Sequence, residues 1–371
     1  MKVLILCDKY LPVSEQFIAY QIQALSGREL FLFARKKVKG AGSSIAYTRQ
    51  VTWYQKTLYR IRYKLTKRAS KYPDFVQQLL RQFISENQIE FVYVHYGTTA
   101  VSYEPALRSL DIPVVCAFHG FDASRKLTDA HYRQSILQLS NSFVQCTVPA
   151  AYLKEKLVST GVLSNKVKIL QYGVDIPKLQ SITPERLTEN LTIVHAGRIV
   201  AKKGVPDLLR VFLQLCEVHP HIQLLVIGGG EEAEQVQELA EASDYKSRVH
   251  MMGPLPHDHL IRLLKGADIF VLNSRESASG ETEGLPNTIL EAMACEVAVV
   301  STRHSGIPDM VSDGVTGVLV QPKSNKELYA AIDTLIRDGK LRKHLIDNAA
   351  RLVADRFSLQ SMVQNVQALI K

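Results

Sequence analysis

Residues 191–204 read LTIVHAGRIVAKKG, and this stretch holds the pattern that decides the fold of the chain. The short apolar run 191–195 has the length and composition of a buried strand. A loop follows it at once, with two glycines and the cations Arg198, Lys202 and Lys203, and a helical pattern comes next. Strand, loop and helix in this order form half of a βαβ unit, from which parallel sheets are built.

The same order recurs through both halves of the chain. Further strands are predicted at residues 2–7, 30–34, 91–95, 114–118, 143–148 and 167–170, and then at 222–227, 249–252, 269–272, 298–301 and 317–320. The pattern lapses over residues 176–190, where Pro177 and Pro184 favour a linker. We therefore predict an α/β protein with two doubly wound parallel-sheet domains, 1–177 and 188–355, facing each other across a cleft. Residues 356–371 are expected to form a terminal helix that returns to the first domain.

The composition sets the class of protein. With 371 residues, 46% of them hydrophobic and 22% charged, the chain has the size of two globular domains. No apolar run approaches the ~18 residues of a membrane-spanning helix. The five cysteines lie far apart without a CxxC pair, at Cys7, Cys116, Cys146, Cys216 and Cys295. They favour reduced core thiols in a cytoplasmic protein over a disulfide framework or a zinc site.

The positive charge gathers in one window near the N-terminus. The net charge is +9, yet twelve Lys and Arg residues and no acid lie between Arg35 and Lys71, which leaves 33 basic and 36 acidic residues elsewhere. Tyr and Trp alternate with these cations. Such a window suits an anionic membrane surface, where each nearby cation contributes about 1 kcal/mol. A solvated face is the simpler alternative, and no recognition motif accompanies the window to support nucleic-acid binding.

The segment Glu283-Gly-Leu-Pro-Asn-Thr-Ile-Leu-Glu291 carries the strongest site pattern. Pro286 suits a first helical position, so the amides of residues 284–288 would form a helix N-terminus, which binds anions. Asn287 and Glu291 share a face of that helix. Two carboxylates near a helix N-terminus suit a ligand with both phosphate and hydroxyl groups. The alternative is a capped surface helix with solvated acids.

Two other loops that follow strands hold unusual residues. Arg198, Lys202 and Lys203 can hold a pyrophosphate, the arginine through its fork and the lysines as point charges; a solvated basic turn is the alternative. The loop Gly228-Gly229-Gly230 formally fits the motif of dinucleotide cofactors. Its place in the middle of the second domain, with no acid clearly ending the next strand, favours close backbone approach to another ligand.

In the first domain, the segment Phe118-His119-Gly120-Phe121-Asp122 follows a predicted strand. His119 and Asp122 therefore lie at the carboxyl end of that strand, where open α/β sheets bind ligands. A lone histidine is more often structural, and for His119 we weigh the structural and the functional interpretation equally. The segment Tyr172-Gly173-Val174-Asp175 follows the last strand of this domain and is expected to line the cleft.

Taken in order, these segments resemble glycosyltransferase family 4, and within it the enzymes of bacterial exopolysaccharide and colanic acid synthesis. The acid pair within EGLPNTILEAMA is the most specific element, joined by GRIVAKKG, VIGGGEE, FHGFD, YGVD and SDGVTGVLV. The resemblance covers nearly the whole chain. It implies the GT-B fold of two Rossmann-like domains, the first for the acceptor and the second for the nucleotide-sugar. It also implies sugar transfer with retention at the anomeric carbon, without a metal or a bound cofactor.

The resemblance assigns roles to residues. Arg198 and Lys203 would bind the diphosphate and offset the charge that builds up as it leaves. Glu283 would hydrogen-bond sugar hydroxyls, Glu291 the ribose hydroxyls, and His119 would lie against the reacting face of the sugar. The remaining donor contacts would come from the glycine loop and the helix start: Gly229, Gly230, Gly284, Leu285, Pro286, Asn287 and Thr288. The departing phosphate would take the proton of the acceptor, so no conventional protein base is implied.

The chain departs from the family after the first strand. Many members have a glycine-rich loop there, whereas residues 10–18 read YLPVSEQFI. Ser14 is a candidate contact to a phosphate or to the acceptor, and Asp122 is another.

We therefore expect a hexosyltransferase that moves a sugar from a UDP-sugar to a hydroxyl of a lipid-linked saccharide or glycolipid in polysaccharide or glycoconjugate synthesis. GDP-mannose is the second candidate donor. The expected location is cytoplasmic, at the inner face of the plasma membrane, held peripherally through the window Arg35 to Lys71, with no nucleic-acid partner. Two alternatives stay open: a UDP-sugar epimerase of the same fold, and a membrane- or nucleic-acid-binding protein with an inactive cleft. No sequence signal indicates an oligomeric state.

Overall fold

The computed structural model describes residues 1–8, 16–34, 45–47, 74–278 and 280–370. The chain forms two compact units, Met1–Gln171 with Met362–Lys371 and Tyr172–Ser361. Ser14 and nearly all of the basic window from Arg35 to Lys71 lie outside the described residues.

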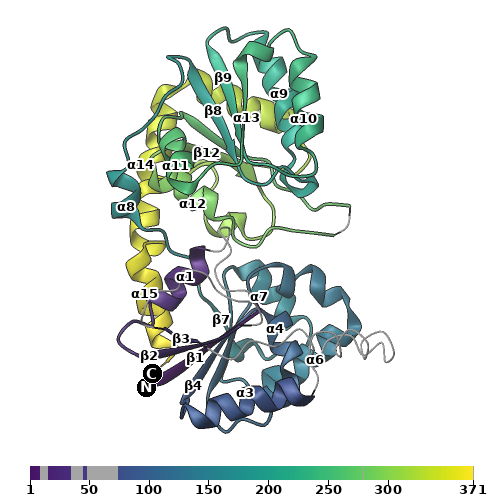
Figure 1. Cartoon of the computed structure of the whole chain (residues 1–371). Coiled ribbons are helices and arrows are strands. Elements are labelled where there is room, and N and C mark those ends of the chain that lie inside the picture. Colours follow the sequence, from purple (N-terminus) through teal and green to yellow (C-terminus); the bar gives the residue numbers. More distant parts are fainter. Residues whose placement is uncertain (9–15, 35–44, 48–73, 279, 371) are drawn as a thin grey trace. The chain divides into compact units, whose positions relative to one another are not determined.

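The first unit is built on a sheet of parallel strands. Within the described residues it has seven strands, in the order β3-β2-β1-β4-β5-β6-β7 (Figure 1). They are β1 (Lys2–Cys7), β2 (Glu29–Ala34), β3 (Ile45–Tyr47), β4 (Phe91–His95), β5 (Val114–Ala117), β6 (Gln145–Val148) and β7 (Val167–Ile169). Leu4 of β1 pairs with Phe31 on one side and with Val92 on the other, so the strand order reverses at β1. Both faces of β1 are covered, which explains why its sequence is a continuous apolar run.

Helices cover this sheet and bury one stripe each. They are α1 (Gln16–Gln23), α3 (Asp74–Glu86), α4 (Gly97–Ser102), α5 (Glu104–Leu107), α6 (Ala130–Ser142), α7 (Ala151–Val158) and α15 (Leu359–Ala368). Val76, Leu80 and Ile84 of α3 are spaced four apart and all buried, as an amphipathic helix requires. The C-terminal helix α15 contacts this unit, where Gln367 donates a hydrogen bond to the carbonyl of Ala24.

The second unit has its own parallel sheet. Its described strands lie in the order β10-β9-β8-β11-β12-β13. They are β8 (Leu191–Ala196), β9 (Ile222–Ile227), β10 (Val249–Gly253), β11 (Ile269–Leu272), β12 (Ala298–Thr302) and β13 (Val318–Val320). Ile193 of β8 pairs with Leu224 and with Ile269, so the order reverses between β8 and β11. The carboxyl ends at such a switch point are where a ligand is expected.

Two groups of helices pack on the second sheet. One group is α9 (Val205–Cys216), α10 (Ala233–Glu241) and α13 (Asn325–Arg337), and the other is α8 (Ile176–Ser181), α11 (His257–Lys265), α12 (Asn287–Ala294) and α14 (Gly339–Arg356) (Figure 1). Leu208, Phe212 and Leu215 carry the buried face of α9. Among the helices in the described ranges, none combines the length and the apolar character that crossing a membrane requires.

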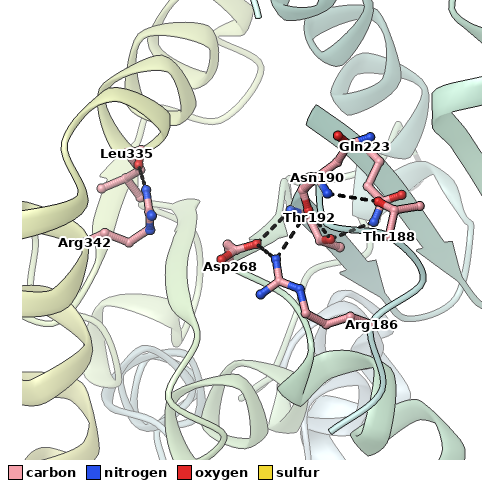
Figure 2. A network of polar contacts seen from close by, with 8 residues as sticks. All are labelled: Arg186, Thr188, Asn190, Thr192, Gln223, Asp268, Leu335 and Arg342. Atoms are coloured by element: carbon pink, nitrogen blue, oxygen red, sulfur yellow. Dashed lines mark hydrogen bonds and ion pairs between the residues drawn. The ribbon is translucent and has the colours of Figure 1, made fainter. Parts of the chain in front are cut away.

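A polar network fastens the chain where it enters the second sheet. Oδ2 of Asp268 accepts hydrogen bonds from the backbone amide of Thr192 and from the guanidinium of Arg186, both at 2.8 Å (Figure 2). Thr192 Oγ1 in turn accepts from Gln223 at 2.8 Å. These contacts tie β8 to β9 and β11 at their amino ends, which leaves the carboxyl ends for the site.

The predicted fold class is confirmed: the chain is an α/β protein with two doubly wound parallel sheets. Each strand expected from the sequence is present within one or two residues of its predicted bounds. The short edge strand β3 was not predicted.

Candidate active site

The loop after β8 places two lysines over the carboxyl edge of the second sheet. Gly204 has φ +60°, a left-handed conformation that turns the chain from this loop into α9. A Cβ on Gly204 would lie 2.5 Å from the carbonyl oxygen of Asn273, so no side chain fits there. Asn273 also donates a hydrogen bond to the Gly204 carbonyl at 3.1 Å. The loop is thus held against the end of β11.

Lys202 and Lys203 converge on one buried carboxylate. Oε1 of Glu283 lies 3.1 Å from Nζ of Lys203 and 3.8 Å from Nζ of Lys202. Burial opposes ionisation of Glu283, but the charges of the two lysines outweigh it and hold the pKa of the carboxyl below its ordinary value. Glu283 is only 6% exposed, so this ion cluster lies within the protein rather than on its surface. Two cations against one anion leave it with a net positive charge.

Arg198 adds a third cation to the same neighbourhood. Its side chain is exposed, its charge acts on Lys202, and within the described part of the chain it has no ion pair. Its guanidinium is therefore available to an anion that comes from solvent.

The start of α12 lies directly after Glu283. The helix begins at Asn287, one residue later than the sequence predicts, and no described side chain caps its first amides. The Oδ1 atom of Asn287 is buried without a hydrogen-bond partner among the described residues, as are the hydroxyls of Ser274 and Thr282. Buried polar groups without partners are rare in folded proteins. The uncapped amides at the start of α12 suit an anion.

Glu291 lies one turn further along α12 and is already paired. Its Oε1 accepts a hydrogen bond from Nε2 of His257 at 2.9 Å. This hydrogen bond raises the pKa of His257, although burial opposes the shift. His257 starts α11, and the sequence analysis did not single it out.

Backbone packing explains why glycines follow β9. The sequence analysis instead attributes them to close approach of a ligand. In the structure Gly228 has φ +138°, and a Cβ there would lie 1.9 Å from the carbonyl oxygen of Gly197. A Cβ on Gly230 would lie 2.3 Å from the carbonyl oxygen of Ile199. Backbone packing between this loop and the loop that carries Arg198 therefore already requires glycine, and the donor contact of Gly229 and Gly230 stays a prediction.

In the first unit, Asp122 orders the loop after β5. Its Oδ1 accepts hydrogen bonds from the amides of His119 at 2.9 Å and Gly120 at 3.1 Å, and its Oδ2 accepts one from Gly97 at 2.8 Å. Asp122 is fully buried. Both of its oxygens are therefore committed to backbone, and the role of the half-buried His119 stays a prediction.

Two residues that the sequence analysis missed belong to the second site. Arg275 forms an ion pair with Asp207, and its amide donates to the carbonyl of Lys202 at 2.8 Å, so it ties the loop after β11 to the lysine loop. His304 follows β12, and the charge of Glu283 acts on it; burial lowers its pKa. Both residues come directly after predicted strands, and the strand-end rule that selected Arg198 could have found them.

The structure thus brings most of the predicted site residues to one edge of the second unit. Lys203 and Glu283 lie together, the charge of Arg198 acts on the neighbouring Lys202, and the start of α12 with Glu291 follows Glu283 in the chain. His119 and Asp122 lie in the first unit. The segment 172–175 starts the second unit, where Asp175 caps α8 by accepting from the amide of Lys178.

Comparison with known proteins identifies two family domains. The chain matches the family described as Glycosyltransferase Family 4 over residues 19–178 and the family described as Glycosyl transferases group 1 over residues 178–352. It is 26% identical, over a 405-residue alignment that covers all of both chains, to WcaL of Salmonella typhimurium, a protein named for colanic acid biosynthesis as a glycosyltransferase. It is 29% identical over 276 residues to the amylovoran biosynthesis glycosyltransferase AmsK of Erwinia amylovora, covering 71% of this chain and 66% of AmsK.

Among solved structures, HepE of Anabaena has the same fold. Its complex with UDP aligns with a TM-score of 0.79 at 18% identity, covering 100% of this chain and 99% of HepE. Its complex with UDP-glucose aligns with a TM-score of 0.77 at 19% identity. At this level of identity the likeness establishes the fold, which is GT-B.

Proposed function

The chain belongs to the glycosyltransferases, with a family 4 domain followed by a group 1 domain, and from this membership we propose that it transfers a sugar from a UDP-sugar to a hydroxyl of a lipid-linked saccharide or glycolipid in polysaccharide biosynthesis. The names of WcaL and AmsK, both polysaccharide enzymes, support the pathway. The UDP and UDP-glucose complexes of HepE support the donor class.

The cation cluster of the second unit is the observation that carries the proposal. Lys202 and Lys203 converge on a single buried carboxylate, the charge of Arg198 acts on Lys202, and together they leave net positive charge beside the uncapped start of α12. A nucleoside diphosphate brings the opposite charge and the acceptor oxygens that these groups lack. A fold that only binds membranes or nucleic acid has no need for such a cluster at a sheet switch point.

The same groups would act on the chemical step. As the bond between the sugar and the diphosphate breaks, negative charge builds up on the leaving phosphate. Lys203 is held beside the sheet edge by its ion pair with Glu283, and the exposed Arg198 lies in the same loop; both would stabilise that charge. Glu283 would orient the sugar through its hydroxyls. Reaction at the front face, with the departing phosphate taking the acceptor proton, retains the anomeric configuration and requires no metal.

The acceptor is assigned to the first unit and the membrane to the basic window. A lipid-linked acceptor lies at a membrane surface, and the twelve cations from Arg35 to Lys71 suit anionic lipids. Neutralising Lys64, Lys67 and Arg68 together should lower sedimentation of the protein with anionic liposomes and leave zwitterionic liposomes unaffected. Undiminished binding of the variant to anionic liposomes would show that the window is an ordinary solvated face.

The test of the proposed activity is a transfer assay with labelled UDP-sugars and a bacterial lipid extract as acceptor. The proposal predicts label in the lipid fraction that depends on the extract and is lost in Glu283→Gln and Arg198→Ala. An altered sugar nucleotide formed without the extract would indicate an epimerase. Transfer or biological function that survives both substitutions would indicate a binding protein with an inactive site. GDP-mannose serves as the alternative donor in the same assay.

A further inference from the structure

A histidine of a neighbouring helix makes a hydrogen bond to Glu291 of α12. In the second unit α11 packs against α12 (Figure 1). His257 is the first residue of α11, and its Nε2 lies 2.9 Å from Oε1 of Glu291. The expected contact between Glu291 and a ribose does not involve His257, so the role of this histidine is open.

The helix α11 directs its first histidine to Glu291. Ile261 lies one turn further along and is fully buried, so His257 shares the inward face of the helix. The His257 side chain is 22% exposed and that of Glu291 is 15% exposed, so water competes little for their hydrogen bond. His259 lies on a different face and pairs with Glu185 at 3.5 Å. The two histidines of α11 therefore serve different carboxylates.

The hydrogen bond has one possible direction. An ionised carboxylate only accepts hydrogen bonds, so Nε2 of His257 carries the proton between the two side chains. The other nitrogen, Nδ1, is buried without a hydrogen-bond partner among the described residues, and it lies 3.8 Å from Oδ1 of Asp258. His257 therefore donates from Nε2 whether its ring is neutral or charged, and the contact with Glu291 orients the ring.

The surrounding charges leave Glu291 as the main partner of His257. The hydrogen bond with Glu291 raises the pKa of His257 above its ordinary value, although burial opposes the shift. Lys178 of α8 acts against protonation, and Asp258 of α11 favours it. Nζ of Lys178 lies 3.7 Å from Oδ1 of Asp258, so the effects of these two charges oppose each other. Protonation of His257 therefore depends mainly on Glu291.

A carboxylate that is held before its ligand arrives binds that ligand at lower cost. A free glutamate side chain loses rotamer freedom when a ligand fixes it, and a hydrogen bond made beforehand reduces this cost. His257 binds Oε1 of Glu291, which leaves Oε2 for the hydroxyls of a ligand. One carboxylate oxygen has acceptor capacity for both hydroxyls of a ribose.

We propose that His257 is a positioning residue for the nucleotide: it donates from Nε2 to Oε1 of Glu291 and holds this carboxylate so that Oε2 accepts from the ribose hydroxyls. The role toward the ribose rests on the proposed function, whereas the pairing of the two side chains does not. His257 itself touches no part of the nucleotide and acts only through Glu291.

A double-mutant cycle on UDP affinity, measured by calorimetry, tests this role. His257→Phe keeps a ring but removes the donor, so it should weaken UDP binding roughly tenfold. His257→Gln can donate from nearly the position of Nε2 and should restore affinity to within threefold of the wild type. In a Glu291→Ala background, His257→Phe should change UDP affinity by less than twofold. Affinity for inorganic diphosphate, which has no ribose, should stay within about twofold in every variant.

The matched control is His259→Phe, which removes the other histidine of α11 and its contact with Glu185. It should leave UDP affinity within twofold of the wild type. A loss in His257→Phe that persists in the Glu291→Ala background, or that is equal for diphosphate, would show that His257 only packs and would overturn the proposal. If the wild type binds no uridine nucleotide, the proposed function fails and the ribose role fails with it.

NMR of the full-length protein with ¹⁵N-labelled histidine tests the pairing without any ligand. The signals of His257 are identified by their loss in His257→Gln. The proposal predicts a protonated Nε2 on both sides of the titration. It also predicts that the pKa of His257 falls in Glu291→Gln, because burial then opposes protonation without help from the carboxylate. An unprotonated Nε2 in the neutral ring, or a pKa that Glu291→Gln leaves unchanged, would overturn the proposal.

Discussion

Lys203 and Glu283 form a buried ion pair in the second unit, with 3.1 Å between Nζ and Oε1. In the proposed reaction the same ammonium binds the diphosphate and the same carboxylate binds the sugar. Without a sugar, the carboxylate competes with phosphate for Lys203. Glu283 should therefore weaken binding of a nucleotide that lacks a sugar, although the enzyme requires it for transfer.

Replacing Glu283 should separate binding from turnover. Glu283→Gln keeps the shape of the side chain and frees the lysines, so affinity for UDP should rise about tenfold, equivalent to about 1.4 kcal/mol, while transfer falls by roughly 10²-fold. Calorimetry and the transfer assay measure the two effects. Glu276→Gln removes an exposed acid from the same loop and should change both by less than threefold. A parallel loss of UDP affinity and transfer in Glu283→Gln would contradict the competition.

Glu291 should contribute to binding of the ribose and not to binding of the phosphates. Its charged hydrogen bonds to ribose hydroxyls contribute about 1.5–3 kcal/mol, so Glu291→Ala should weaken UDP binding by roughly 10- to 100-fold. Affinity for inorganic diphosphate, which has no ribose, should stay within about twofold. Equal weakening of both ligands would show that the substitution only disturbs α12, and unchanged UDP affinity would remove Glu291 from the nucleotide site.

The packing of the loops after β8 and β9 makes Gly228 a stability residue. A methyl group there would lie 1.9 Å from the Gly197 carbonyl, so Gly228→Ala should lower the free energy of unfolding by roughly 3 kcal/mol through overpacking and strain. Gly314→Ala is the matched control, because Gly314 has φ +70° but a methyl group there would have no atom within 4 Å. Strain alone should cost the control about 1 kcal/mol. Equal losses in urea denaturation would exclude the contact between the loops.

His195 should contribute to acid sensitivity. It is fully buried, burial lowers its pKa to about 4, and Nδ1 lies 3.1 Å from the Val271 carbonyl. Between pH 6.5 and 4 the His195 imidazole binds a proton in the unfolded chain but not in the folded chain, so the free energy of unfolding falls as the pH drops through this range. Across this range His195 alone should lower the free energy of unfolding by at most about 3 kcal/mol.

The urea midpoint measured between pH 7.5 and 5 tests this assignment. His195→Asn keeps a donor for the carbonyl but cannot titrate, so its midpoint should fall less steeply with pH than that of the wild type. His221→Asn replaces an exposed histidine of the same unit and should leave the slope unchanged. An identical slope in His195→Asn and wild type would mean that other groups cause the acid sensitivity.

The fold could be predicted because buried parallel strands leave a continuous apolar signature. β8 and β11 are covered on both faces, so Ile193 and Phe270 lie in apolar runs that no other element explains. Among the described strands, β3 pairs only with β2, and it has three residues, so its sequence carries little such signal.

The site could be predicted only in part, because a loop position shows that a residue is near a strand end but not which partner it meets. Selecting residues in loops that follow strands identified Lys203 and Glu283, but it did not reveal that the two side chains form an ion pair. It placed Asp122 beside a ligand, whereas the structure commits that carboxylate to three backbone amides. The sequence analysis did not find His95, because it is the last residue of an apolar strand, and only the fold brings its Nδ1 to 3.1 Å from Nε2 of His119.

The central claim, that the second unit binds a nucleotide-sugar donor through Arg198 and Lys203, is tested most directly by calorimetric titration with UDP, GDP, ADP and TDP, without metal and then with magnesium. The account predicts saturable binding of one nucleotide, UDP first, with an affinity that magnesium does not change and that falls at least 100-fold in the double variant Arg198→Ala, Lys203→Ala, equivalent to about 2.7 kcal/mol. Binding of no nucleotide, or binding that the double variant retains, would contradict it.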